Sequence, residues 1–149
     1  MKLEEEIQQK KFRNEYHKLA VNLIYTHGWF IEKQSRLFND YGLTNSQFNI
    51  LRILRGQHPN PASINLLKER MLEKMSDVSR LVDRLMKKGW VDRQICPDDR
   101  RRAEVVITKE GLKILKEIDK RDSEIDDVLN GITKKEAMVI NELLDKLRR

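Results

Sequence analysis

The chain has 149 residues, of which 39% are hydrophobic and 36% charged, and its formal net charge is +6. This length suits one domain, residues 1–149, and the composition excludes a disordered or membrane-spanning chain. The acidic start lacks the pattern of a secretory signal, so a cytoplasmic protein without a membrane partner is expected. Between Lys74 and Arg102, nine Lys and Arg residues outnumber five Asp and Glu residues, which favours a polyanionic partner.

The N-terminal part of the chain is predicted to form one long amphipathic helix. Apolar side chains recur from Phe12 to Tyr41 at spacings close to 3.6 residues per turn, with charged residues between them. Gly42 ends this helix. A capping box from Thr44 to Gln47 then opens a second, short helix, which runs out before Gly56 and a loop with two prolines.

Two further short helices follow with only a tight turn between them. Ser63 is placed to cap the third helix. The fourth helix spans Ser76 to Lys88 and stops at Gly89, and its apolar face is expected to be buried. That face consists of Val78, Leu81, Val82 and Leu85.

Residues 90–108 are predicted to form a β-hairpin, because apolar residues there recur with a period of two. The turn covers residues 97–102, where a proline and two aspartates suit a tight connection. Three successive arginines then give the hairpin a basic tip. Thr108 caps a long fifth helix that Gly131 closes, and a second capping box, Thr133 to Glu136, opens a sixth helix.

This order of elements predicts a mainly α fold with a small β-hairpin wing, that is, a winged helix-turn-helix at residues 44–108. The fourth helix is the expected recognition helix in the DNA major groove. The wing tip is expected in the minor groove, where negative potential is concentrated, and Asp98 is expected to hold a neighbouring arginine in position. The candidate DNA-binding residues are Ser76, Asp77, Ser79, Arg80, Asp83, Arg84, Lys87, Asp98, Arg100, Arg101 and Arg102.

The chain resembles the MarR-type multiple antibiotic resistance regulators from about Tyr16 to Arg149. The motifs that carry the resemblance are Leu43-Thr44-x-x-Gln47-Phe48-x-x-Leu51, Ser76-Asp-Val-Ser-Arg-Leu-Val-Asp-Arg-Leu85-x-x-x-Gly89-Trp-Val91, Asp98-x-Arg100-Arg101 and Ile107-Thr108-x-x-Gly111. The resemblance implies a homodimeric repressor of near-palindromic operators, which a small phenolic or anionic effector releases from DNA. Residues 1–43 and 109–149 would then be the helical dimerisation region.

Side chains on the first helix are candidates for contact with such an effector, because they are aromatic or titrate near neutral pH. They are Tyr16, His17, His27 and Trp29. Cys96 beside the wing is the single cysteine, and packing is its favoured role over oxidant sensing.

The sequence contains no pattern of a catalytic or metal site. The three histidines lack metal-ligand spacing, and neither a phosphate-binding glycine loop nor a nucleophile with a base partner is evident. We therefore expect a non-enzyme without cofactors. The alternative function is a winged-helix module that binds protein or structured RNA rather than duplex DNA.

Overall fold

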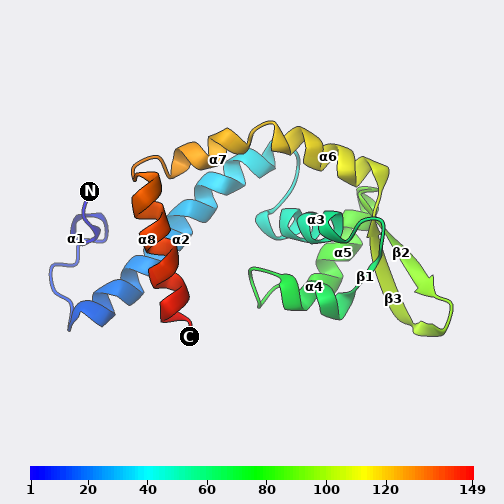
Figure 1. Ribbon diagram of the computed structural model, residues 1–149, viewed down its shortest axis with the longest axis horizontal. Helices are drawn as coiled ribbons and strands as arrows, with labels where there is room; N and C mark the ends of the chain where they lie inside the picture. The colour runs from blue at the N-terminus through cyan, green and yellow to red at the C-terminus, as the bar shows by residue number, and fades with distance from the viewer.

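A computed structural model gives the backbone of residues 1–149 and describes every side chain except those of residues 96 and 100–102. Helices make up most of the chain, and one small antiparallel sheet projects from them (Figure 1). The elements in chain order are α1 Leu3–Glu6, α2 Glu15–Asn39, α3 Asn45–Gln57, β1 Ala62–Ser63, α4 Ile64–Arg70, α5 Val78–Lys87, β2 Val91–Cys96, β3 Asp99–Ile107, α6 Lys109–Asp119, α7 Asp122–Val128 and α8 Lys134–Leu147.

Most predicted helix starts are confirmed by side-chain caps. The Thr44 hydroxyl accepts from the Gln47 N–H while the Gln47 side chain accepts from the Thr44 N–H, and Thr133 and Glu136 form the same capping box before α8. Ser63 and Thr108 cap α4 and α6. These short-range bonds satisfy N–H groups that a helix start leaves without partners.

The N-terminal prediction is wrong in its bounds. The long helix α2 begins only at Glu15, where the Asn14 side chain accepts a hydrogen bond from the His17 N–H. Phe12 therefore lies before the helix, with its ring packed edge-on against the His17 ring. The short helix α1, which the sequence did not predict, precedes α2.

The predicted fifth helix is divided into α6 and α7 at Lys120 and Arg121. The Arg121 guanidinium binds Asp40 at the end of α2 and both carboxylate oxygens of Glu124. The break lets α6 pack on α3 while α7 packs on α2. A straight helix could not follow both surfaces.

The hairpin forms as predicted, with two additions. Its turn consists of Pro97 and Asp98, so β3 begins earlier than the predicted turn allows. The two-residue strand β1 pairs with β3 and completes a sheet of order β1-β3-β2. The register of β2 and β3 places Val91 opposite Ile107, which closes the sheet onto the helices.

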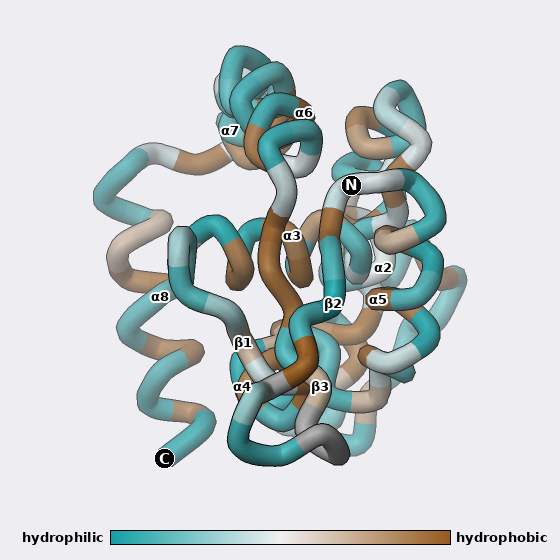
Figure 2. Tube along the Cα trace, turned by 90° about the vertical axis from the view of Figure 1, so that its right-hand side faces the viewer, coloured by the Kyte–Doolittle hydropathy of each residue, from teal (hydrophilic) through white to brown (hydrophobic). Residues whose placement is uncertain are grey.

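The hydrophobic core lies in the winged helix and in the elements directly beside it. Its buried side chains run from Leu37 at the end of α2 to Ile118 on α6. In Figure 2 hydrophobic colour gathers around α3, β1 and α4, whereas α8 stands to one side of the molecule, away from α2. Among the described residues, no helix is long and apolar enough to cross a membrane.

Candidate nucleic-acid interface

Helix α5 has one buried and one charged face, as its sequence predicts. Val78, Val82 and Leu85 are buried in the core. The opposite face is exposed, and it carries Ser79, Arg80, Asp83, Arg84 and Lys87. The three cations outnumber the one carboxylate there, so this face suits a polyanion.

The start of α5 differs from the expectation. Asp77 is the N-cap, and its carboxylate accepts a hydrogen bond from the Arg80 N–H at 3.2 Å. Ser76 lies outside the helix, and its hydroxyl oxygen is buried without a hydrogen-bond partner among the described atoms. The predicted start of the helix at Ser76 is therefore wrong, because Asp77 fixes where the helix begins, and a DNA contact by Ser76 stays a prediction.

An ion pair ties the middle of α5 to the wing. Arg93 Nη2 on β2 lies 2.8 Å from Asp83 Oδ1. The pair neutralises the carboxylate that would otherwise repel phosphate, and it fixes the helix against the sheet. The sequence predicts Arg93 only as a strand residue, because a pattern of period two does not show which helix faces the strand.

The end of α5 is fixed by contacts of its own. The Lys88 ammonium lies 4.9 Å from the centre of the Trp90 ring and also binds the carbonyl of Gly42. The Thr108 hydroxyl donates to the Gly89 carbonyl at 2.7 Å. α5 is thus held at its start, middle and end, which gives its exposed side chains a defined orientation.

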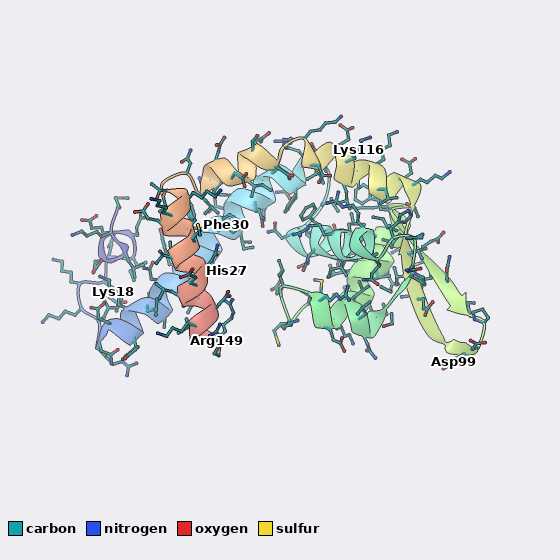
Figure 3. All side chains as sticks on the ribbon, viewed as in Figure 1. Lys18, His27, Phe30, Asp99, Lys116 and Arg149 are labelled. Carbon is teal, nitrogen blue, oxygen red and sulfur yellow. The ribbon has the colours of Figure 1, made fainter. Side chains whose placement is uncertain are left out.

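The wing extends away from the helices, with Asp99 at its far end (Figure 3). The predicted DNA contacts Arg100, Arg101 and Arg102 lie outside the side chains that the structure describes, as does Cys96. The predicted support of an arginine by Asp98 therefore stays a prediction.

A second group of exposed side chains lies far from α5. All fourteen residues of α8 are described and none is buried, although the helix is amphipathic. Its large apolar side chains lie open to solvent, and a cavity of about 350 Å³ adjoins two of them, Val139 and Ile140. They are Met138, Val139, Ile140, Leu143 and Leu147, and α2 exposes Leu19, Leu23, Ile24, Tyr25 and Trp29.

A cavity of about 280 Å³ lies between α2 and α7. Its lining combines apolar side chains with carboxylates and with cations, one of which is Arg121. The Arg121 guanidinium holds the pKa of the Glu124 carboxyl below its usual value. The full lining is Lys33, Gln34, Arg36, Leu37, Asp40, Arg121, Glu124, Ile125 and Val128.

The predicted effector contacts do not line this cavity. Tyr16 is 83% exposed at the start of α2, and His17 binds the Arg13 N–H through Nδ1. His27 and Trp29 lie further along α2, on its solvent-exposed part. Their role in ligand binding stays a prediction.

The fold and this surface define a winged helix-turn-helix protein with helical extensions at both ends. The sequence model of the MarR family matches residues 43–103, which cover α3 to the wing. The chain is also 28% identical over 123 residues to the multiple antibiotic resistance protein MarR of Salmonella typhimurium, covering 78% of this chain and 83% of that protein.

Solved structures of MarR-type regulators share the fold. A cysteine-to-serine mutant of MarR from E. coli, complexed with operator DNA, has a TM-score of 0.81 at 22% identity and covers 93% of this chain and 99% of its own. BpsR of Bordetella bronchiseptica, whose DNA binding is regulated by 6-hydroxynicotinic acid, has a TM-score of 0.79 at 22% identity, covering 89% of this chain and 99% of its own. The chain is thus similar to MarR-type transcription regulators in the sequence of its winged helix and in its fold.

Proposed function

We propose that this protein is a homodimeric repressor that binds a near-palindromic operator in duplex DNA and releases it when a small effector binds. The observation that carries the proposal is the exposed basic face of α5, fixed at its start, middle and end. The operator complex of E. coli MarR supports it, because that protein has the same fold.

In this proposal α5 lies in the major groove. Arg80 and Arg84 contact guanine or phosphate, Ser79 contacts either, and Lys87 contacts phosphate. Asp77 and Asp83 act on DNA indirectly, since one caps the helix and the other binds Arg93. The wing arginines, with Arg100 first among them, enter the adjacent minor groove.

A second copy of the chain covers the apolar side chains of α2 and α8. An amphipathic helix without a single buried residue gains little from folding beside its own lobe, and burial against a partner removes its apolar surface from water. Homo-oligomers of this kind are most often two-fold symmetric, so two α5 helices would meet two half-sites. The near-palindrome follows from that symmetry.

The effector site in this proposal is the cavity between α2 and α7. Lys33, Arg36 and Arg121 supply positive charge, and Leu37 and Ile125 supply apolar surface. This combination suits a small aromatic acid or phenol. 6-Hydroxynicotinic acid, which regulates DNA binding by BpsR, is an aromatic acid. A ligand carboxylate at Arg121 would compete with Asp40 and loosen the junction between the two parts of the chain.

The proposal is tested by fluorescence anisotropy with duplexes selected from a random library, at several salt concentrations. Wild-type protein should select inverted half-sites about one helical turn apart, with affinity that falls steeply as salt rises. Weak binding that is equal for every duplex would contradict the proposal and favour a protein- or RNA-binding module. Adding 6-hydroxynicotinic acid to the preformed complex then probes for release by an aromatic acid.

Arg84→Ala sharpens this test. The variant should lose about 1–3 kcal/mol of operator binding and keep its fold, and Arg100→Ala should lose a similar amount. Lys116→Ala is the matched control, because it removes the same charge from α6, where Lys116 lies at the top edge of Figure 3 while Asp99 at the wing tip lies at the lower right. Equal losses in all three variants would show that net charge alone sets the affinity.

A further inference from the structure

The turn between α4 and α5 exposes two large apolar side chains. Leu72 is 82% exposed and Met75 is 92% exposed. Among the described residues of the winged helix, Ile95 on β2 is the other large apolar side chain that is open to solvent, at 71%. Single exposed apolar residues are common on protein surfaces. Leu72 and Met75, however, lie three positions apart in the same connection, residues 71–77.

This turn is anchored to the lobe rather than loose. The Leu72 N–H donates to Asn49 Oδ1 at 2.8 Å, and the Ser46 hydroxyl donates to Glu73 Oε2 at 3.1 Å. Met71, directly before Leu72, is buried in the core. The backbone of the turn is thus fixed on α3, so Leu72 and Met75 project from a defined position without packing on their own chain.

The turn also lies at the end of α5 that matters for base recognition. Met75 precedes the N-cap Asp77 by two residues, and the N-terminal residues of a recognition helix are those that contact base edges. Lys74 and Arg80, on either side of it in sequence, are exposed cations suited to phosphate. The turn therefore adjoins the start of the proposed DNA-binding helix, and it is separate from α8 (Figure 1).

We propose that Leu72 and Met75 contact the 5-methyl groups of thymines in the major groove of the operator. Thymine is the base that presents a methyl group there, and apolar side chains recognise it by contact. The inference rests on the proposed function, and it adds to that function a preference for thymine at a fixed position in each half-site. Polar contacts from α5 would supply the remaining specificity.

The test replaces each thymine of the selected operator by uracil, one at a time. This change keeps the base pair and removes only the methyl group. Wild-type protein should bind about fourfold more weakly when the contacted thymine of a half-site is replaced, the loss expected for one methyl-sized apolar contact. Uracil at the other thymines should leave the affinity unchanged.

Two variants assign the effect to the turn. Met75→Ser and Leu72→Ser should each bind the thymine operator about fourfold more weakly than wild type, and each should no longer distinguish uracil from thymine at a position where only the replaced side chain contacts the methyl group. Ile95→Ser is the matched control. It removes an exposed apolar side chain from the wing, which is proposed to enter the minor groove, where no methyl group lies, so its response to uracil should equal that of wild type.

The outcomes separate this inference from the proposed function. Operator binding that is unaffected by uracil at every thymine, or an effect that persists in both turn variants, would overturn the methyl contact and leave the repressor intact. A selected operator without thymine in its half-sites would overturn it too. Failure of wild-type protein to select any duplex would overturn the proposed function and the inference together.

Discussion

The winged helix and the C-terminal helix α8 differ in how far the rest of the chain buries their apolar side chains. In the winged helix, side chains such as Ile50, Leu67 and Val82 are fully buried by neighbours from the same chain. In α8, Leu143 remains 58% exposed, although the helix is capped as well as any other. A well-formed helix is therefore no sign of a complete core, and one copy of the chain leaves the apolar side chains of α8 exposed.

Ion pairs at the break between α6 and α7 connect this segment to α3 and to the end of α2. Arg55 on α3 binds Asp119 at 2.7 Å, and Arg121 binds Asp40 at 2.8 Å while its guanidinium lies 5.6 Å from the Tyr41 ring centre. These contacts hold α6 and α7 to the winged helix and to α2. They would set the spacing of two recognition helices in a dimer.

The largest expected effect comes from a charge on the exposed face of α8. Leu143→Asp should weaken the dimer by about 100-fold or more, because an unpaired carboxylate would be buried in the interface. Sedimentation velocity over a range of protein concentrations measures this. Asn141→Asp puts the same residue on the opposite side of the helix and should leave the dimer intact. A Leu143→Asp dimer of unchanged affinity would direct attention to another surface.

A substitution that creates a cavity in the winged helix should lower the free energy of unfolding rather than weaken the dimer. Leu85→Ala is expected to lower the free energy of unfolding by about 2–5 kcal/mol, because it empties a fully buried site. Urea unfolding followed by circular dichroism gives this value. Leu72→Ala, which makes the same change at an exposed site, should cost less than about 0.5 kcal/mol. Similar losses in both variants would mean that the lobe is packed less tightly than its burial indicates.

The junction between the wing and α6 should tolerate no added methyl group. A Cβ on Gly111 would lie 2.3 Å from the Trp90 carbonyl oxygen, so Gly111→Ala should destabilise the protein by about 1–3 kcal/mol. A Cβ on Gly56 in α3 would meet no neighbouring atom within 4 Å, so Gly56→Ala should stabilise the protein by up to about 1 kcal/mol. Thermal unfolding of the two variants should therefore give shifts of opposite sign.

The smallest expected effect is the pH dependence of the α8 cap. The Thr133 N–H and hydroxyl both donate to the Glu136 carboxylate, which lowers the pKa of Glu136. A pKa that is lower in the folded state gives stability that is present above the unfolded pKa and is lost as pH falls through the folded one. Glu136→Gln keeps the box but does not titrate. The difference in melting temperature between wild type and Glu136→Gln should shrink between pH 5 and about pH 3, and a constant difference would contradict the assignment.

Local signals account for what could be predicted about the candidate site. The buried face of α5 follows from the spacing of Val78, Val82 and Leu85, and the charged face is the remainder of the same helix. The buried hydroxyl of Ser76 and the pairing of Asp83 with Arg93 could not be predicted, because each depends on how α5 packs against other elements. The exposed pair Leu72 and Met75 could not be separated from buried Met71 by sequence alone.

Capping and periodicity involve residues within a few positions of one another, so the sequence predicts where most helices begin and which of their faces are apolar. The division of the fifth helix at Arg121 depends instead on long-range packing, because its partner Asp40 is 81 positions away. Packing also forms the third strand, because Ala62 pairs with Val105 only when the hairpin and α3 are packed together. Long-range partners are chosen by packing, and packing is a property of the whole chain.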